Sequence, residues 1–234
     1  MDNIFKRHEL KFMLTAEKQR LIYEEIAQKV PRDTFGKYLV QSLYFDTSNW
    51  DVIRRSIDKP IYKEKMRLRC YNVPGEHDTM YLELKKKYRG IVYKRRISFP
   101  AARLKGETPW DITAADDSQI GRELAYYLRV NPVTEKAHIS YDRDAFGADE
   151  NLRITFDSNI RFRTDMLDYS NPKAGLEILD EGLSIMEIKS ISSMPLWLSR
   201  SLSKFEIFPR SFSKYGVGYK KYILKGGKFD ELTQ

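Results

Sequence analysis

Basic side chains alternate with apolar ones between positions 65 and 71 of the 234-residue sequence, in the order Lys-Met-Arg-Leu-Arg-Cys-Tyr. Because successive side chains of a β-strand point to opposite faces of a sheet, Lys65, Arg67 and Arg69 are expected to share one face. Lysine and arginine bind phosphate oxygens through charge-assisted hydrogen bonds, so this face has the chemistry of a phosphate-binding surface. A half-exposed strand with a basic solvent face would show the same pattern, so the interpretation depends on whether other strands repeat it.

Four more segments place lysine or arginine, with an occasional carboxylate, on the face opposite their apolar residues. The charged positions are Arg7, Glu9 and Lys11; Glu83, Lys85 and Lys87; Arg153 and Asp157; and Glu187 and Lys189. The segment Ile91–Phe99 is less regular, with Lys94 on one face and Arg95 on the other. Buried charges cost several kcal/mol each unless they are paired, and roughly a dozen cations cannot all pair with four carboxylates. If these faces meet, the space between them is expected to be hydrated and to hold a polyanion.

The elements that position these residues are predicted to be strands separated by helices. Helices are predicted at Thr15–Val30, Trp50–Ile57, around Ile120–Leu128, at Pro195–Leu202 and at Tyr219–Leu224. Thr15 is expected to be the N-cap of the first helix. Strands are predicted at Tyr38–Phe45, Lys65–Tyr71, Tyr81–Lys87, Ile91–Phe99, Lys136–Arg143, Leu152–Ser158 and Leu183–Lys189, after a first alternating run at Arg7–Phe12. Residues 101–115 are predicted to be irregular. If the helices cover the apolar faces and the sheet closes, the result is an α+β barrel with a charged interior.

Composition favours one large domain, residues 1–234, with an anionic partner. Hydrophobic residues make up 41% of the chain, and the formal net charge is +8. The single cysteine, Cys70, excludes an intramolecular disulfide and a multi-cysteine zinc site. The first residues do not resemble a signal peptide, and no apolar run is long enough for a membrane span. The expected location is therefore the cytoplasm.

Standard catalytic and nucleotide-binding motifs are missing from the sequence. It contains no Gly-x-x-x-x-Gly-Lys-Ser/Thr loop, no Gly-x-Gly-x-x-Gly motif and no His-Cys-carboxylate spacing typical of zinc. A triphosphate would therefore have to be bound without either of these glycine-rich phosphate-binding loops. Two alternatives remain: an open sheet whose charged face meets solvent, and a single-stranded nucleic-acid surface at Lys214–Tyr222, where three tyrosines lie among lysines. That aromatic segment is short, and nucleic acid is the less favoured partner.

Eight short motifs, in order between about residues 5 and 222, carry a family resemblance. They are Arg7-His8-Glu9-Leu10-Lys11, Tyr44-Phe45-Asp46-Thr47, Lys65-x-Arg67-Leu68-Arg69-x-Tyr71, Leu82-Glu83-Leu84-Lys85, Tyr141-x-Arg143, Arg153-x-Thr155-x-Asp157, Met186-Glu187-Ile188-Lys189 and Phe212-Ser213-Lys214-Tyr215. With these motifs the chain resembles a VTC domain, the polyphosphate polymerase module of the triphosphate tunnel metalloenzyme superfamily. The resemblance implies a closed tunnel of eight antiparallel strands with a charged lumen and helices packed outside.

The resemblance also implies ATP and polyphosphate as ligands, and Mn²⁺ or Mg²⁺ as the cofactor. Catalytic roles are expected for Arg67, Arg69, Lys85, Arg143, Arg153 and Glu187. Phosphate or substrate binding is expected for Arg7, Lys11, Lys65, Lys87, Lys94, Tyr141, Lys189, Ser213 and Lys214. Glu187, with help from Glu9, is expected to bind the metal. For Glu9 and Glu83 the alternative is a structural role as spacers between cations.

Two departures from the family pattern bear on activity. The superfamily's hydrolases and cyclases open with Glu-x-Glu-x-Lys, whereas Arg7 replaces the first glutamate here, which favours the VTC branch. Eukaryotic members also carry an SPX domain and membrane helices, which this sequence lacks. Whether a membrane-protein partner supplies the translocation function is therefore left open. The expected function is metal-dependent synthesis of polyphosphate from ATP. The alternatives are hydrolysis of tripolyphosphate or nucleoside triphosphate, and a non-catalytic polyphosphate-binding module.

Overall fold

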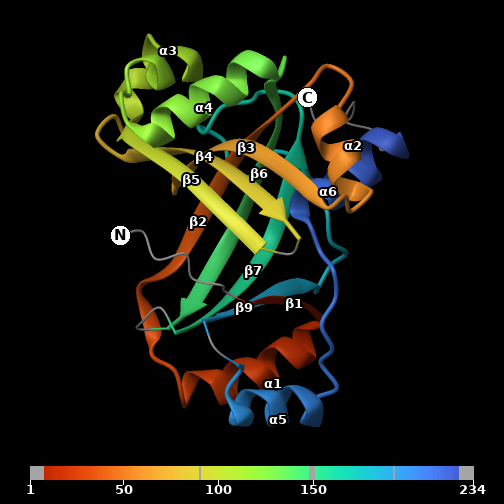
Figure 1. Cartoon of the computed structure of the whole chain (residues 1–234). Helices are drawn as coiled ribbons and strands as arrows, with labels where there is room; N and C mark the ends of the chain where they lie inside the picture. The colour runs from red at the N-terminus through yellow and green to blue at the C-terminus, as the bar shows by residue number, and fades with distance from the viewer. Residues whose placement is uncertain (1–7, 90, 148–150, 192, 227–234) are drawn as a thin grey trace. The chain divides into compact units, whose positions relative to one another are not determined.

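The computed structural model describes residues 8–89, 91–147, 151–191 and 193–226 (Figure 1). Its strands are β1 (His8–Leu14), β2 (Arg32–Asp46), β3 (Tyr62–Tyr71), β4 (Thr79–Tyr88), β5 (Ile91–Pro100), β6 (Thr134–Phe146), β7 (Leu152–Arg163), β8 (Leu176–Glu177) and β9 (Ser184–Ser190). Its α-helices are α1 (Ala16–Ala27), α2 (Asp51–Ile57), α3 (Pro109–Ala114), α4 (Gln119–Val130), α5 (Leu196–Lys204) and α6 (Lys214–Gly218). A 3₁₀ helix (Ala101–Lys105) and a π-helix (Tyr219–Leu224) complete the described elements. The predicted α+β class is confirmed.

The strands form one large sheet in the order β1-β9-β7-β6-β2-β3-β4-β5, and the two-residue β8 pairs with β7. The pairs β1–β9, β9–β7, β2–β3, β3–β4 and β4–β5 are antiparallel, as predicted. Within the described residues this order is an open path with β1 and β5 at its ends, so the predicted closure into a barrel is not observed. Alternation in the sequence fixes which face of a strand is charged, but it does not specify which strand edges form hydrogen bonds.

The described residues pack as two compact units. Of the described residues, the first unit contains 8–39, 141–147, 151–160, 177–191 and 193–214, and the second contains 40–89, 91–140, 161–176 and 215–226. The long strands β2, β6 and β7 contribute residues to both units. Each unit has its own hydrophobic core and its own set of charged strand faces, and each is described separately below.

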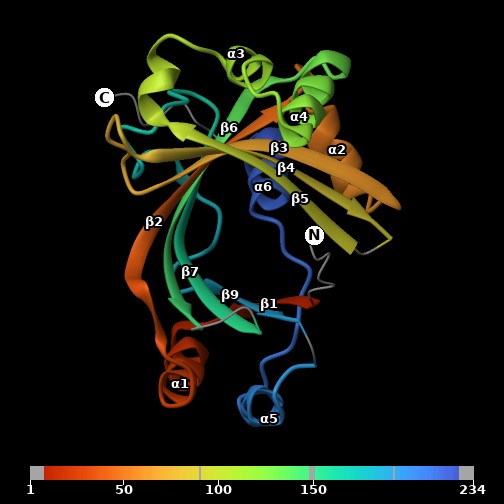
Figure 2. The same cartoon turned by 60° about the vertical axis from the view of Figure 1, so that its left-hand side comes forward.

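In the second unit, α3 and α4 cover the apolar face of strands β3, β4 and β5 (Figures 1 and 2). Met66, Leu68 and Leu84 from the strands are fully buried with Leu124 and Leu128 of α4. Helix α6 lies on the opposite face of the same strands, as Figure 2 shows. The apolar side chains of each strand are therefore used for packing, which leaves the alternate, charged side chains for the other face.

The region predicted to be irregular contains helix α3, so that prediction is wrong. Thr108 and Asp111 form a capping box, in which each side chain accepts a hydrogen bond from the other residue's backbone N–H. Pro109 occupies the first turn, where it needs no hydrogen-bond partner for its nitrogen. The Thr-x-x-Asp spacing was visible in the sequence. It was missed because the segment is only six residues long and has no repeated helical period.

Charges on the apolar face of the β4–β5 hairpin are neutralised by helix α4. Lys86 Nζ and Arg95 Nε each lie 3.3 Å from the Glu123 carboxylate. This pairing explains why the hairpin carries charge on both faces in the sequence. Lys86 and Arg95 are used for packing against α4, whereas Lys85 and Lys94 point to the opposite face.

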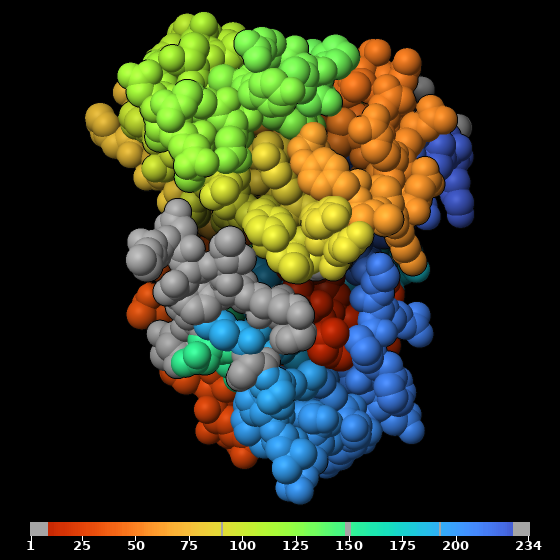
Figure 3. Space-filling model, viewed as in Figure 1, coloured from red at the N-terminus to blue at the C-terminus, as the bar shows by residue number. Residues whose placement is uncertain are grey.

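In the first unit, α1 and α5 pack on the apolar side of β1, β7 and β9. Thr15 caps α1 by accepting a hydrogen bond from the Lys18 backbone N–H, as its position in the sequence predicts. Ile22 and Ile26 of α1 join Leu198 of α5 in a buried cluster. The two helices contact each other. In the space-filling view, blue atoms of the α5 region lie next to orange-red atoms of the N-terminal part of the chain (Figure 3). No described helix is long and apolar enough to cross a bilayer.

Candidate functional site: two charged strand faces

The charged face of strands β3, β4 and β5 in the second unit carries a large excess of positive charge. Cross-strand register places Lys65 opposite Lys85 and Lys85 opposite Lys94, and it places Arg67 opposite Glu83 and Glu83 opposite Arg96. By alternation this face, called the cationic face below, presents eight cations and one carboxylate: Lys63, Lys65, Arg67, Arg69, Lys85, Lys87, Lys94, Arg96 and Glu83. Such a surface attracts anions.

Glu83 holds two of these cations in place. Its carboxylate lies 2.7 Å from Arg67 Nη2 and 2.7 Å from Lys94 Nζ, and the residue is 1% exposed. Burial alone would raise the pKa of Glu83, but the positive charges of Arg67, Arg69 and Lys94 lower it to about 2. Glu83 is therefore anionic at neutral pH, and its two oxygens are already used in ion pairs. This geometry matches the spacer role that the sequence offered as an alternative for Glu83.

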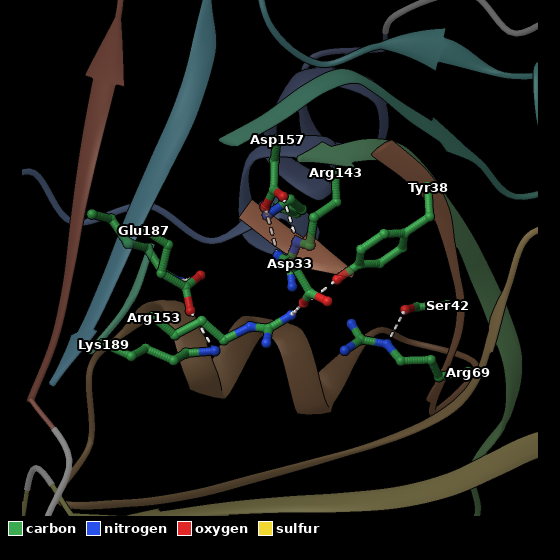
Figure 4. Close-up of polar contacts among 11 residues, drawn as sticks. Asp33, Tyr38, Ser42, Arg69, Arg143, Arg153, Asp157, Glu187 and Lys189 are labelled. Atoms are coloured by element: carbon green, nitrogen blue, oxygen red, sulfur yellow. Dashed lines mark hydrogen bonds and ion pairs between the residues drawn. The ribbon is translucent and has the colours of Figure 1, made fainter. Parts of the chain in front are cut away.

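Tyr44 of β2 adds an acidic phenol to the same face. Its hydroxyl oxygen accepts a hydrogen bond from Arg67 Nη1 at 3.2 Å, and its ring stacks on Tyr215 with centroids 4.6 Å apart. Burial would raise the pKa of Tyr44, but Arg67, Arg69 and Lys65 lower it to about 7. Arg69 itself donates to Ser42 Oγ at 3.1 Å (Figure 4). Two of the predicted catalytic arginines are thus held in fixed orientations by neighbours on β2.

The first unit carries a second charged face, in which cations and carboxylates are nearly balanced. We call it the paired cluster; its members are Glu9, Lys11, Arg143, Asp157, Glu187, Lys189 and Lys214. On β1 and β9 the charges form a checkerboard, because Lys11 is the cross-strand partner of Glu187 and Glu9 is the partner of Lys189. Lys11 Nζ also donates to the Phe212 carbonyl oxygen at 3.1 Å, which ties β1 to the segment before Lys214.

Asp157 binds two cations of the paired cluster at once. Arg143 forms a two-point ion pair with it, with N–O distances of 2.7 and 2.8 Å (Figure 4). Lys214 Nζ lies 2.6 Å from the same carboxylate. Asp157 is fully buried; burial would raise its pKa, but the positive charges of Arg143 and Lys214 lower it. The ring of Tyr141 lies 4.4 Å from Lys214 Nζ and 5.2 Å from the Arg143 guanidinium carbon. Residues predicted from separate motifs therefore form one connected group.

Glu187 is a buried acid of the paired cluster with a strongly lowered pKa. Its carboxylate lies 2.7 Å from Lys189 Nζ (Figure 4) and 4.0 Å from Lys11 Nζ, and only 7% of the residue is exposed. Burial would raise the pKa of Glu187, but the surrounding charges, chiefly Lys189 and Lys11, lower it well below its usual range. A carboxylate that stays ionised while buried can serve a hard divalent cation.

A buried hydroxyl next to Glu187 has no partner in the part of the chain that the structure describes. Thr155 lies directly across from Glu187 in the β7–β9 ladder, and its Oγ1 is buried without a hydrogen bond. An unsatisfied buried hydroxyl costs about 1–3 kcal/mol, so a bound water or ligand oxygen would stabilise it. Thr155 was not predicted as a site residue; the Arg-x-Thr-x-Asp spacing contained it, but its missing partner is visible only in the structure.

The carboxylates of this region fit a metal bound jointly with substrate. No group of three or more His, Cys, Asp or Glu side chains arranged to hold a metal occurs among residues 8–89, 91–147, 151–191 and 193–226. Glu9 and Glu187 both contact Lys11, at 3.2 and 4.0 Å. One or two carboxylates completed by waters and phosphate oxygens are a usual environment for Mg²⁺ at phosphoryl-transfer sites. With the orphaned Thr155 hydroxyl beside them, these donors suit that mode.

Arg153 makes its own contacts within the first unit. Its Nη2 lies 2.7 Å from Asp33 and donates to the Tyr38 hydroxyl at 3.3 Å (Figure 4). It is the cross-strand partner of Lys189, which places it at the margin of the paired cluster. The acidic partner Asp33 was not foreseen, because it lies 120 residues away in the sequence.

The structure divides the predicted site residues between the two faces. The cationic face contains Lys65, Arg67, Arg69, Lys85, Lys87 and Lys94, and the first unit contains Glu9, Lys11, Tyr141, Arg143, Arg153, Glu187, Lys189, Ser213 and Lys214. Arg7 lies outside the described residues. The sequence assigned no site role to Asp157, Thr155, Tyr44 or Arg96. For Arg96 the signal was present, since it alternates with Lys94 on the same strand.

Comparison with known proteins identifies the family. A family model for the VTC domain matches residues 6–223. The chain belongs to the VTC domain family. The predicted resemblance is thus confirmed, and the VTC match covers both charged faces described above. No curated protein sequence matches this VTC-family chain significantly.

Solved structures support the same fold for this VTC-family chain. The Hippeastrum protein HpAC1, a candidate adenylyl cyclase with a dominant triphosphatase activity, superposes with a TM-score of 0.56 at 15% identity, over 91% of this chain and 94% of that one. A candidate adenylate cyclase from Bacillus halodurans gives a TM-score of 0.53 at 13% identity, over 89% and 95%. These superpositions show that the chain shares the fold of these two proteins.

Proposed function

We propose that the chain is a metal-dependent phosphotransferase that moves the γ-phosphate of ATP to phosphate or to a growing polyphosphate chain. An acceptor oxygen would form the new P–O bond while the bond between the γ-phosphorus and the β–γ bridging oxygen breaks, and ADP would leave. Phosphoryl transfer requires alignment and charge neutralisation more than covalent help from protein. No side-chain nucleophile is needed, since the terminal phosphate of the acceptor is already anionic.

The observation that carries this proposal is the charge imbalance of the cationic face. Eight cations share one buried carboxylate there, and that carboxylate already pairs with Arg67 and Lys94. On these three strands the charged face therefore has far more positive than negative charge, and this excess would attract a polyphosphate or triphosphate. Arg67 and Arg69 are oriented for this role by Tyr44 and Ser42.

The paired cluster supplies the groups for metal and for the reacting phosphates. Glu187, with Glu9, would hold Mn²⁺ or Mg²⁺, which when bound neutralises phosphate charge as a Lewis acid. Arg143 and Lys214 would bind phosphate oxygens while Asp157 keeps both in place. Lys11 and Lys189 would do the same beside Glu187. We also propose that the two units function as one VTC domain, because the family match extends over both.

Hydrolysis of triphosphate is the second candidate function. It is favoured by the fold likeness to HpAC1, which is described as having a dominant triphosphatase activity. In hydrolysis, water replaces the phosphate acceptor and a side chain must orient it. The buried Thr155 hydroxyl and the Tyr44 phenol are groups that could hold such a water.

Product analysis separates these functions. The purified chain is incubated with ATP and Mn²⁺, and separately with tripolyphosphate and Mn²⁺. Long-chain polyphosphate together with ADP supports synthesis, whereas orthophosphate without polymer supports hydrolysis. Binding of triphosphate without turnover under any of these conditions would refute both enzymatic functions and leave a polyphosphate-binding module.

A further inference from the structure

Two tyrosines lie at one end of the cationic face, next to Arg96, which belongs to that face. Tyr81 of β4 is the cross-strand partner of Arg69, and Tyr71 lies two residues beyond Arg69 on the same face of β3. The two rings meet edge to face, with centroids 6.0 Å apart and planes at 70°. The Arg96 guanidinium lies over the Tyr81 ring, 4.5 Å from its centre. The three side chains form a layered aromatic and guanidinium group.

These tyrosines are not part of a hydrophobic core. The apolar cluster of β3 and β4 lies on the opposite face of the same strands, against α4. Tyr71 is 39% exposed, and Tyr81 is only partly buried. In another aromatic pair of this unit, Tyr44 and Tyr215, the two rings stack on each other with planes 24° apart, so the facing sides of the rings are already covered. An exposed aromatic group beside a guanidinium is instead the kind of surface on which nucleobases stack.

The spacing along the strands suits a nucleoside triphosphate. Strand residues rise by about 3.4 Å each, so the row of Arg69 and Tyr81 lies about 14 Å from the row of Lys65, Lys85 and Lys94. The row of Arg67 and Arg96 lies between them. A triphosphate that contacts the two cationic rows would extend its sugar and base toward the tyrosines. Inorganic polyphosphate has no group to place there.

We propose that Tyr71, Tyr81 and Arg96 form a base-stacking subsite, which gives the cationic face a preference for nucleoside triphosphates over inorganic triphosphate. The inference depends on the proposed function, because it assumes that triphosphate binds the cationic face. It adds a source of specificity that the cations alone cannot supply, since lysine and arginine contact only the phosphates. Stacking involves the flat face of any base, so purines are expected to bind more tightly than pyrimidines.

The test compares ATP with tripolyphosphate. The affinities of the wild-type chain and of the variants Tyr71→Leu, Tyr81→Leu and Tyr81→Phe for both ligands are measured by calorimetry. Metal is left out so that no turnover occurs. Tyr126→Leu is the matched control, because Tyr126 is also exposed and also lies near an arginine, Arg129, but belongs to α4 on the opposite face of the strands. Far-ultraviolet circular dichroism and thermal unfolding confirm that each variant is folded.

Each leucine variant is expected to weaken ATP binding about tenfold, equivalent to about 1.4 kcal/mol, and to change tripolyphosphate binding less than twofold. Tyr81→Phe and the control should retain the affinity for ATP. Equal loss for both ligands, or no loss for either, would overturn the stacking subsite while leaving the proposed function intact. A wild-type chain that binds neither ligand would refute the proposed function itself, and the subsite with it. An oligonucleotide without a triphosphate that binds as tightly as ATP would also overturn the proposal, in favour of a nucleic-acid surface.

Discussion

The cationic face of the second unit and the paired cluster of the first unit use the same residue types with different charge balance. The cationic face carries eight cations and one carboxylate. The paired cluster carries four cations and three carboxylates, and most of its members form ion pairs at 2.6 to 4.0 Å. Asp157 and Glu187 are almost fully buried, whereas Lys94 and Arg96 are exposed.

The difference indicates different tasks. Buried ion pairs contribute little net stability, but they fix the orientation of each partner, and removal of one partner leaves an unpaired buried charge. Exposed cations that outnumber the carboxylates on the same strand face attract an added anion. The paired cluster is therefore suited to positioning groups and holding a metal, and the cationic face to recruiting phosphate. The two regions should respond differently to substitution.

The largest expected effect is on stability, from Asp157→Asn in the paired cluster. The substitution leaves both Arg143 and Lys214 without their carboxylate in a buried place. We expect a loss of about 3–5 kcal/mol in the free energy of unfolding, measured by urea denaturation. Glu24→Gln, which removes an exposed pair with Arg20 on α1, is the control and should cost less than about 0.5 kcal/mol. Equal stability of the two variants would show that the buried pairs are not structural.

The next effect separates the two buried glutamates. Glu187→Gln should lower Mn²⁺ affinity and metal-dependent turnover by at least about 100-fold, because a carboxylate ligand is replaced by a weaker amide. Glu83→Gln, in the cationic face, should leave Mn²⁺ affinity within about twofold, since its oxygens serve Arg67 and Lys94. The Mn²⁺ affinities of both variants are measured by electron paramagnetic resonance, with Mn²⁺ titrated in the presence of a non-hydrolysable triphosphate. If Glu83→Gln lost the metal and Glu187→Gln kept it, the assignment of tasks would have to be reversed.

A smaller effect tests the cationic face with two adjacent lysines. Lys85 points to the cationic face, and Lys86 points to the opposite face and pairs with Glu123. Lys85→Gln should weaken tripolyphosphate binding about five- to tenfold and reduce its dependence on salt by about one counterion. Lys86→Gln removes the same charge from the chain and should change the affinity less than twofold. Similar losses in both variants would mean that binding follows net charge rather than the cationic face.

Alternation in the sequence was sufficient to predict which side chains share a face. Lys65, Arg67 and Arg69 lie together, as do Glu187 and Lys189, because the two-residue period of a strand is fixed by backbone geometry. Spacing also predicted α1 and its cap, Thr15. These features depend on neighbours in sequence, which is why the sequence alone was enough.

Features that depend on distant residues could not be predicted in this way. The partners of Asp157 are 14 and 57 residues away, so its central place in the paired cluster depends on strand pairing and on the segment that carries Lys214. The difference in charge balance between the two regions could not be predicted either, because alternation within a strand does not indicate which strands pack together in one region. The expected barrel closure failed for the same reason, because the pairing of strand edges is a long-range property.

The smallest expected effect concerns the protonation of Tyr44 on the cationic face. Three cations, Arg67, Arg69 and Lys65, lower its pKa to about 7 from the usual value of 10 despite burial. In the paired cluster, by contrast, the neighbouring cations lower the pKa values of Asp157 and Glu187, which are carboxyl groups and titrate in the acid range. Ultraviolet absorption of phenolate should therefore show one tyrosine that titrates near neutral pH, and Tyr44→Phe should remove that step.

The sign of the stability change follows from the lowered pKa. An acid whose folded pKa lies below its unfolded pKa stabilises the fold when ionised, so the contribution of Tyr44 is complete above the unfolded value and is lost as pH falls through about 7. Relative to Tyr44→Phe, the wild type should gain up to about 1 kcal/mol in free energy of unfolding between about pH 7 and pH 8. Bound tripolyphosphate should raise the pKa of Tyr44, because its negative charge opposes ionisation. A phenolate titration that is unchanged by saturating tripolyphosphate would show that the anion does not bind beside Arg67, and the distinction between the two regions would lose its main support.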